Sequence, residues 1–245
     1  MATIYDVAAY AGVSPKTVSR VINGDAPVSD KTRAKVETAI AALGYIPSSA
    51  ARVMRSNRSD LVGLITGAIS RTGEYGGVHG LPDMFLIKGI QQKIREAGKT
   101  LMIADTDNRY EQIDPLVRTF MEHRAEGILY VTESHREIVL PEMPNRCPMV
   151  LVNCFDAAGT PSVLPDDERG QYDLVRNIIR HGHRRIAYIT LQAGAEATRL
   201  RLAGYRRALD ESDMVFDPDL VQTGITDFAN DSEPLIAAVL KLLSL

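Results

Sequence analysis

The chain has 245 residues, 45% of them hydrophobic, and 28 Lys and Arg against 31 Asp and Glu give a net charge of −3. This is enough for one large or two modest globular units, and two cysteines, Cys147 and Cys154, exclude a disulfide framework or a cysteine metal finger. The opening residues have no signal-peptide pattern and no apolar run could span a bilayer, so we expect a soluble cytoplasmic protein with no membrane partner.

The charge is distributed unevenly along the chain. Residues 1–59 contain 8 basic and 4 acidic residues, whereas the remainder contains 20 basic and 27 acidic residues. A basic N-terminal segment followed by an acidic body is typical of a polyanion binder with a separate regulatory or catalytic part. Chance scatter of a few charges is the alternative.

The N-terminal segment has the pattern of three short helices without a strand. Apolar residues recur at helical spacing in each, and Pro15 stands at the first position of the second helix, where its missing N–H is tolerated. Each predicted helix lies between a capping residue and a glycine: Thr3 and Gly12, Ser14 and Gly24, Ser29 and Gly44. The first two helices and their tight turn predict a helix-turn-helix.

The second predicted helix, residues 15–23, carries hydrogen-bond donors without complementary acids. Lys16 and Arg20 are one turn apart and share a face, and either could donate to a guanine edge or a phosphate. Ser19 and Asn23 could position phosphates. A solvated helix face is the alternative, but the basic N-terminal segment favours DNA.

After a polar and basic connector, the residue pattern changes from Leu61 onward, in the part of the chain called the body here. Short apolar runs rich in β-branched residues, such as LVGLIT, TLMIAD, GILYVT, CPMVLVN and RRIAYIT, alternate with helical stretches such as MFLIKGIQQKIREAG and QYDLVRNIIRHG. This alternation predicts a doubly wound parallel sheet covered by helices on both faces.

No pattern of catalytic or metal-binding residues is evident. His181 and His183 lack further ligands nearby, and Asp166, Asp167 and Glu168 precede a predicted helix whose N-terminal dipole favours acids. No nucleophile elbow is present. We therefore predict no catalytic residues, no metal, no cofactor and no enzyme activity.

The segment TIYDVAAYAGVSPKTVSRVIN closely resembles the opening of the LacI/GalR family of bacterial transcriptional regulators. The resemblance continues in VSDKTRAKVETAIAALGYIPSSAARVM and, in the body, in HGHRRIAYIT and RLRLAGYRRAL. It implies a multi-domain protein, with an all-α head and a periplasmic-binding-protein-like α/β sensor of two lobes. The expected parts are a head over residues 1–47, a hinge helix and linker over 48–60, a first lobe over 61–163 and a partial second lobe over 164–245.

The same resemblance assigns DNA-contacting residues. It places Pro15, Lys16 and Arg20 at base-reading positions, and a set of polar residues against phosphates: Thr3, Ser14, Thr17, Ser19, Asn23 and Tyr45. Residues 49–55 match the hinge helix, where the minor-groove contacts would be Ala51, Met54 and Arg55. Family members usually have Leu where this chain has Met54, and methionine is a more flexible apolar wedge. A helix this short is only marginally stable by itself in water. We therefore expect it to form only when it is bound to DNA and packed against the hinge helix of a dimer mate.

In the body, the resemblance implies a small-molecule effector in the cleft between the lobes. Arg201 matches a position that the family uses to hold its effector, Asn153 ends a predicted strand, and Asp166 lies near the lobe crossover. Family members are longer than this chain, so an incomplete second lobe with about two strands is expected.

Together these features predict a transcriptional regulator, expected to repress, that binds a palindromic double-stranded DNA operator as a homodimer in the cytoplasm, associated with the nucleoid. A small metabolite, such as a sugar, would tune its affinity. The alternative is a solute- or sugar-binding α/β protein without a regulatory DNA role.

Overall fold

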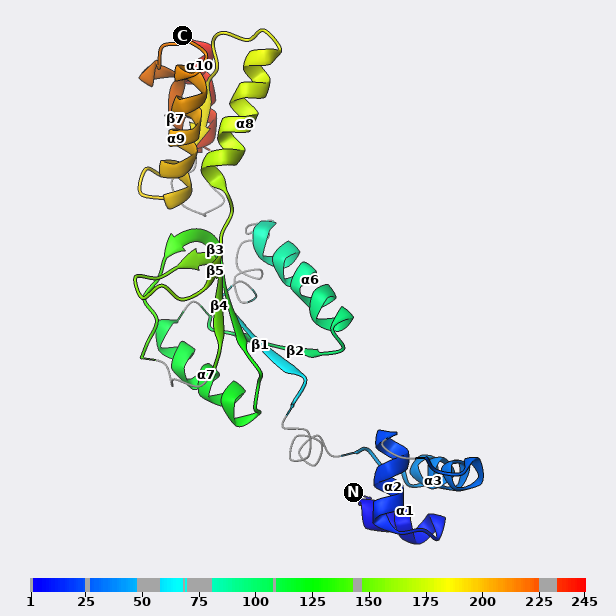
Figure 1. The fold of residues 1–245 in the computed structure, drawn as a ribbon. Helices are drawn as coiled ribbons and strands as arrows, with labels where there is room; N and C mark the ends of the chain where they lie inside the picture. The colour runs from blue at the N-terminus through cyan, green and yellow to red at the C-terminus, as the bar shows by residue number, and fades with distance from the viewer. Residues whose placement is uncertain are drawn as a thin grey trace. The chain divides into compact units, whose positions relative to one another are not determined.

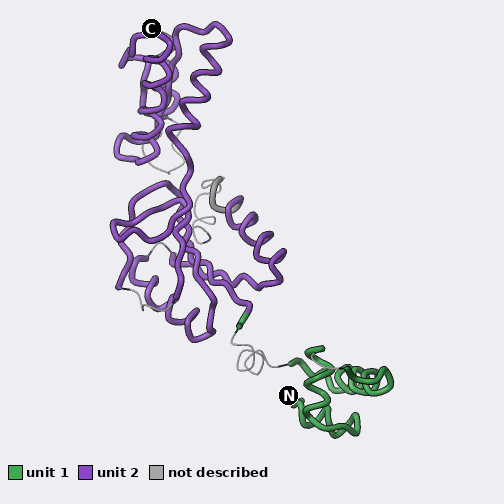
Figure 2. The backbone as a smooth tube through the Cα atoms, in the orientation of Figure 1, with its two compact units in different colours: residues 1–59 green, residues 60–245 purple. Residues whose placement is uncertain are grey.

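The structure is a computed structural model that describes residues 2–24, 27–47, 58–67, 69, 81–107, 109–142, 147–224 and 233–245. These residues fall into two compact units, residues 1–59 and residues 60–245, coloured separately in Figure 2. Each unit has its own packing and is described by itself.

Unit 1 contains the three predicted helices: α1 (Ile4–Ala11), α2 (Pro15–Asn23) and α3 (Asp30–Leu43). The predicted caps are confirmed, because the side chains of Thr3, Ser14 and Ser29 each accept a hydrogen bond from a backbone N–H in the first turn of their helix. The glycine that follows each helix is left-handed, with φ values of 66°, 70° and 56°. Local sequence therefore determines where each helix begins and ends.

The core of unit 1 is built from small apolar side chains of all three helices. Val7 of α1, Val18 of α2 and Val36 of α3 have no exposed surface. Burying a valine contributes about 1.5–3 kcal/mol to the stability of the fold. These contacts hold the apolar side of α2 against α1 and α3. Its opposite side remains exposed.

Unit 2 begins with a five-stranded parallel sheet (Figure 1). Its strands, in the spatial order β2-β1-β3-β4-β5, are β1 (Leu61–Thr66), β2 (Thr100–Asp105), β3 (Ile128–Glu137), β4 (Met149–Phe155) and β5 (Ser162–Val163). Helix α6 (Leu81–Glu96) packs against β2 and β3, while α7 (Ile113–Glu122), which follows the 3₁₀ turn η1 (Tyr110–Gln112), packs against β1. The two helices lie on opposite faces of this sheet, as predicted.

The two covered faces explain the continuous apolar strands. Successive residues of a strand point to opposite faces, and in β1 the side chain of Leu64 packs with Ile87 of α6, whereas Ile65 packs with Val117 and Phe120 of α7. Both positions are buried, so β1 has no polar alternation.

The rest of unit 2 consists of α8 (Asp167–Arg180), β6 (Tyr188–Thr190), α9 (Glu196–Asp210), η2 (Pro218–Leu220), β7 (Val221–Thr223) and α10 (Glu233–Leu243). Strands β6 and β7 pair in parallel, and α8 and α9 lie side by side along their length (Figure 1). In the part of the chain that the structure describes, the second lobe thus has the two strands expected of an incomplete lobe.

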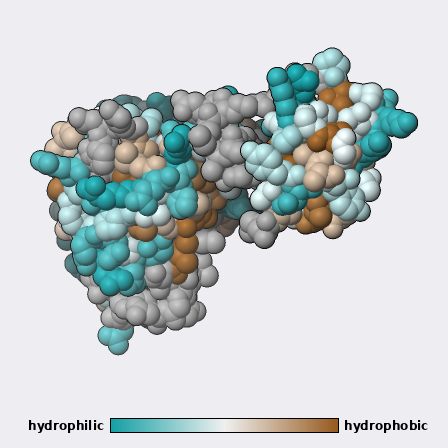
Figure 3. Space-filling view, turned by 90° about the horizontal axis from the view of Figure 1, so that it is seen from below, coloured by the Kyte–Doolittle hydropathy of each residue, from teal (hydrophilic) through white to brown (hydrophobic). Residues whose placement is uncertain are grey.

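One face of the molecule shows how polar and apolar residues are distributed on the surface. In the view of Figure 3, hydrophilic residues cover most of the coloured surface and hydrophobic residues occur in smaller patches. Among the described residues, no helix combines the length and hydropathy required to cross a membrane, and no three acidic, His or Cys residues gather as metal ligands.

The contact between α8 and α9 depends on Gly204. A Cβ atom there would overlap the carbonyl oxygen of Glu168 and lie 3.0 Å from the backbone nitrogen of Tyr172. Gly204→Ala should lower the free energy of unfolding by about 3 kcal/mol, because backbone atoms of α8 must move away. Gly89→Ala is the matched control, since that helical position is open and alanine should be neutral or stabilising. Urea unfolding followed by circular dichroism measures both, and equal stabilities would contradict the close approach.

Candidate functional site

The turn between α1 and α2 fixes the direction of α2. The amide of Val13 donates to the Ala8 carbonyl at 3.0 Å, across Gly12 in its left-handed conformation. The Ser14 Oγ then accepts from the Thr17 amide at 3.2 Å, and Pro15 takes the first helical position. This is the Schellman-type end and capped start expected of a helix-turn-helix.

The outward face of α2 carries unpaired donors. Lys16 and Arg20 are both exposed, and within the described part of unit 1 neither has an acidic partner. Asn23 is placed by its own helix, because its Nδ2 donates to the Ser19 carbonyl at 2.6 Å and to the Ser19 hydroxyl at 3.1 Å. The face therefore offers two cations to a ligand outside the chain.

The other predicted DNA contacts are only partly described. Thr3, Ser14, Thr17 and Tyr45 lie at or next to helix ends; Thr3 and Ser14 are exposed, and Thr17 and Tyr45 are partly exposed. Ala51, Met54 and Arg55 lie outside the described residues. All of these assignments stay predictions.

In unit 2, β3 has a pronounced bulge against β4. Val131 pairs with Val152 and Arg136 pairs with Cys154, so residues 132–135 all lie opposite Asn153. Asn153 has φ of +61°, which asparagine tolerates better than most residues. Its Nδ2 donates to the Thr132 carbonyl at 3.0 Å, and the Thr132 hydroxyl donates to the Asn153 carbonyl at 3.0 Å. Asn153 thus braces the bulge from within β4.

The bulge brings His135 to the start of α8. The Nδ1 of His135 lies 2.8 Å from Oδ2 of Asp167, while Nε of Arg201 donates to Oδ1 of the same carboxylate at 2.6 Å. The His135 and Asp167 side chains are 5% and 3% exposed, whereas that of Arg201, on α9, is 40% exposed. Asp167 is also the first residue of α8, where the helix dipole favours a negative charge.

A cavity of about 540 Å³ lies beside this cluster. Its polar lining consists of Asp166, Asp167, Gln171, Thr190 and Arg201, and its apolar lining includes Leu174, Tyr188, Ile189, Leu191 and Leu235. Asp166 caps α8, because its Oδ1 accepts from the Arg169 amide at 3.1 Å. Burial raises the pKa of the Tyr188 phenol, which keeps it a neutral donor.

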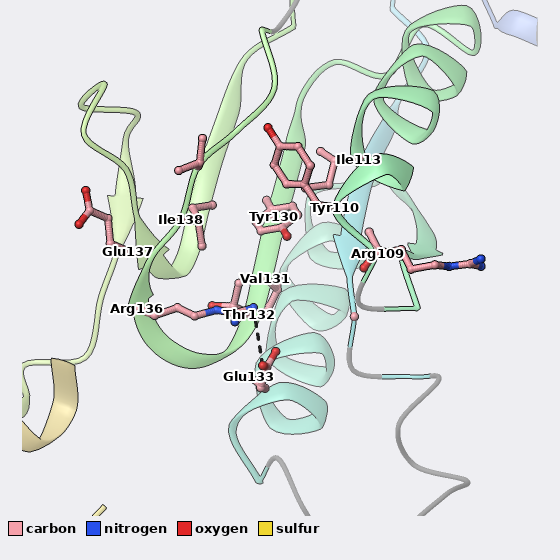
Figure 4. Close-up of a pocket in the computed structure, with 13 residues that line it drawn as sticks. Arg109, Tyr110, Ile113, Tyr130, Val131, Thr132, Glu133, Arg136, Glu137 and Ile138 are labelled. Carbon is pink, nitrogen blue, oxygen red and sulfur yellow. Dashed lines mark ion pairs between the residues drawn. The ribbon is translucent and has the colours of Figure 1, made fainter. Parts of the chain in front are cut away.

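A second cavity, of about 270 Å³, lies at the carboxyl ends of β1, β2 and β3 (Figure 4). Gly67, Thr106 and Thr132 come from these strand ends, and Tyr110 and Ile113 come from η1 and α7. The guanidinium of Arg136 faces Glu133 at 3.6 Å. Parallel sheets bind ligands at this edge, so the cavity is the first-lobe candidate for a ligand contact.

The structure brings two of the three predicted effector residues together. Arg201 and Asp166 line the larger cavity, whereas Asn153 lines neither and its amide is engaged by Thr132. Two further residues of the cluster around Arg201, His135 and Asp167, are not among the effector residues predicted from the sequence. The predicted strand stopped at Thr132, and Asp167 was interpreted only as an acid at a helix N-terminus.

Comparison with known proteins identifies the family of the chain. Residues 3–48 match the model described as bacterial regulatory proteins of the lacI family, and residues 84–243 match the model of periplasmic binding proteins and the sugar binding domain of the LacI family. The chain belongs to the LacI family. This confirms the predicted DNA-binding transcriptional regulator with a helix-turn-helix head and a sugar-binding type of sensor, rather than an enzyme.

Individual relatives agree with this assignment. The ribose operon repressor of Escherichia coli (strain K12) is 34% identical over 233 residues, which are 93% of this chain and 67% of the repressor. A putative LacI-family regulator from Rhizobium etli is 32% identical with a TM-score of 0.66, covering 77% of this chain and 65% of that one. The lac repressor dimer bound to operator and the anti-inducer ONPF is 26% identical with a TM-score of 0.64, covering 87% and 63%.

The chain therefore spans about two thirds of the relatives that it matches. As a DNA-binding regulator of this family, it is assigned to the cytoplasm.

The capping box of α1 predicts an acid-sensitive head. The Thr3 amide and hydroxyl both donate to Oδ2 of Asp6 at 2.8 Å, and these bonds lower the pKa of Asp6 below its ordinary value of 3.8. A depressed native pKa stabilises the fold above the ordinary carboxyl range, and the stabilisation is lost as the pH falls through the native value. Asp6→Ala should make the head less stable at pH 7, and the difference should shrink as the pH falls from the ordinary carboxyl range through the lowered native pKa of Asp6. Thermal melts from pH 7 into the acid range measure the difference in stability between the unsubstituted chain and Asp6→Ala, with exposed Glu37→Ala as control. A difference that stays constant with pH would show that the cap does not depend on the ionised Asp6 carboxylate.

Proposed function

We propose that the chain is a repressor that binds a palindromic operator as a homodimer, is associated with the nucleoid, and responds to a small neutral polyhydroxyl effector such as a sugar. In this proposal residues 1–47 read DNA, 48–60 connect, and 61–163 and 164–245 form the two lobes of the sensor. The observation that carries it is the exposed face of α2, where Lys16 and Arg20 have no acidic partner among the described residues.

The DNA contacts follow from the geometry of α2. A major groove accommodates one helix, and residues near the helix N-terminus reach base edges. Pro15 and Lys16 occupy that end, and Arg20 follows one turn later on the same face. Hydroxyls at the helix starts, those of Thr3, Ser14 and Thr17, are suited to phosphates.

The homodimer follows from the size of the head. One short helix contacts only a few base pairs, so two heads on a two-fold symmetric operator are needed for specificity. The lac repressor, which this chain resembles, is described as a dimer on its operator. Ala51, Met54 and Arg55 would contact the minor groove between the two half-sites.

The larger cavity favours a neutral effector. Among the described lining residues, Asp166 and Asp167 are two acids and Arg201 is the one base, so an anionic ligand would meet a net negative charge there. The Nε of Arg201 is bonded to Asp167, which leaves its Nη groups to donate to ligand hydroxyls. The apolar residues of the lining, Leu174 and Tyr188 among them, suit the C–H faces of a sugar ring.

The first test is the salt dependence of binding to duplex DNA. The full chain should bind with a steep negative slope of log affinity against log salt, because phosphate contacts release counterions. Arg20→Ala should lose about 1–3 kcal/mol of operator binding and relax base preference at one position. Fluorescence anisotropy with a selected operator and single-base variants measures both.

Lys35→Ala is the matched control, because it removes one exposed positive charge from α3 instead of α2. It should leave base preference unchanged. An equal loss for Arg20→Ala on every sequence would make Arg20 a phosphate contact. A flat salt slope without retention on DNA would favour the solute-binding alternative.

The second test concerns the effector. D-ribose, D-galactose and D-glucose form the neutral panel, and D-ribose 5-phosphate is the anionic comparison. Arg201→Lys should weaken the best-bound neutral sugar about tenfold, because a lysine cannot keep the Asp167 bond and donate to the ligand in one plane. Arg199→Lys, two residues away and paired with Glu196 at the surface, is the control. Isothermal titration calorimetry measures each affinity; tighter binding of the phosphate than of every neutral sugar would contradict the proposed class.

A further inference from the structure

We propose that His135 is a positioning residue for the effector site: it holds the Asp167 carboxylate from the first lobe, and Asp167 in turn orients Arg201 in the second. The inference rests on the proposed function in taking the cavity beside Arg201 as the effector site. His135 does not line that cavity, but through Asp167 it determines how Arg201 is oriented toward a ligand.

The cluster requires both partners of the carboxylate. Asp167 is almost fully buried, and a buried carboxylate is costly unless its oxygens are hydrogen-bonded. Oδ2 faces Nδ1 of His135 at 2.8 Å, and Oδ1 accepts from Nε of Arg201 at 2.6 Å. Each oxygen therefore has one partner from a different element, which fixes the plane of the carboxylate and hence that of the guanidinium.

His135 is itself held in place. It ends the bulge that Asn153 braces through two hydrogen bonds with Thr132. Its ring also meets the Phe155 ring edge to face, with centroids 5.8 Å apart and an interplanar angle of 82°. A rotamer fixed by packing and by a braced backbone is what a positioning residue requires.

The arrangement links the two lobes through one shared carboxylate. Any change that withdraws β3 from the start of α8 leaves Oδ2 of Asp167 without its donor and frees the carboxylate to rotate. Arg201 then loses the orientation of its Nη groups. Binding of a ligand to Arg201 and the contact between β3 and α8 should consequently favour each other.

Two substitutions of His135 separate positioning from packing. His135→Leu keeps an apolar side chain of similar bulk but removes the donor, whereas His135→Asn places an amide N–H near the position of Nδ1. His135→Leu should weaken the best-bound neutral sugar of the panel about tenfold, and His135→Asn should restore most of the affinity. His183→Leu, at an exposed site, is the matched control.

A second readout needs no ligand. In ¹H–¹⁵N spectra of the full chain, the Arg201 Nε–H resonance, assigned by its loss in Arg201→Lys, should be sharp and protected from exchange. It should shift and broaden in His135→Leu but stay near its original position in His135→Asn, while the dispersed amide spectrum shows that each variant is folded. An unchanged Arg201 resonance in His135→Leu would overturn the proposal even if no sugar of the panel binds. If the unsubstituted chain did not bind an operator, that result would instead count against the proposed function.

Discussion

The buried carboxylate of Asp167 is the constraint on which the organisation of the sensor body depends. Its two oxygens are bonded to residues 32 and 34 positions away in the sequence, His135 on β3 and Arg201 on α9. Because a buried acid without partners is costly, the elements that supply these partners cannot move apart independently. The N-terminus of α8 adds a favourable dipole. One side chain thus connects the bulge of the first sheet, the start of the second lobe and Arg201 in the wall of the cavity.

The head differs in this respect, because its described core and its helix ends are formed by residues of unit 1. The buried residues of its core come from α1, α2 and α3, and each helix carries its own capping residue and terminal glycine. The donor face of α2 is therefore positioned by contacts within unit 1. In a regulator built this way, an effector acts by changing where two heads are placed relative to each other and not by refolding either one.

Local signals explain how much of this could be predicted from the sequence. The helix limits of the head follow from Thr3, Ser14 and Ser29 and from the glycines, all of which act within one turn, and the parallel sheet follows from apolar runs with both faces buried. Arg201 was identified through the resemblance of its segment to the family. His135 and Asp167 could not be identified in this way, since their pairing joins segments 32 residues apart. The strand signal ended at Thr132, whereas β3 continues to Glu137 through a bulge that no periodicity predicts. Asn153 was expected near a ligand because it is polar near a strand end, but its amide serves the bulge.

The shared use of Arg201 also explains how such a site can select by charge. An anionic ligand would compete with Asp167 for the guanidinium, and any gain from the new ion pair would be offset by leaving the buried carboxylate with one partner fewer. Neutral hydroxyls avoid this competition, because they accept from the Nη groups while the Nε bond to Asp167 persists. Selectivity then arises from a difference between ligands and not from strong attraction to one of them. The same carboxylate that fixes the geometry of the cavity thereby determines which charge of ligand the cavity tolerates, and His135 supports both properties from the neighbouring lobe.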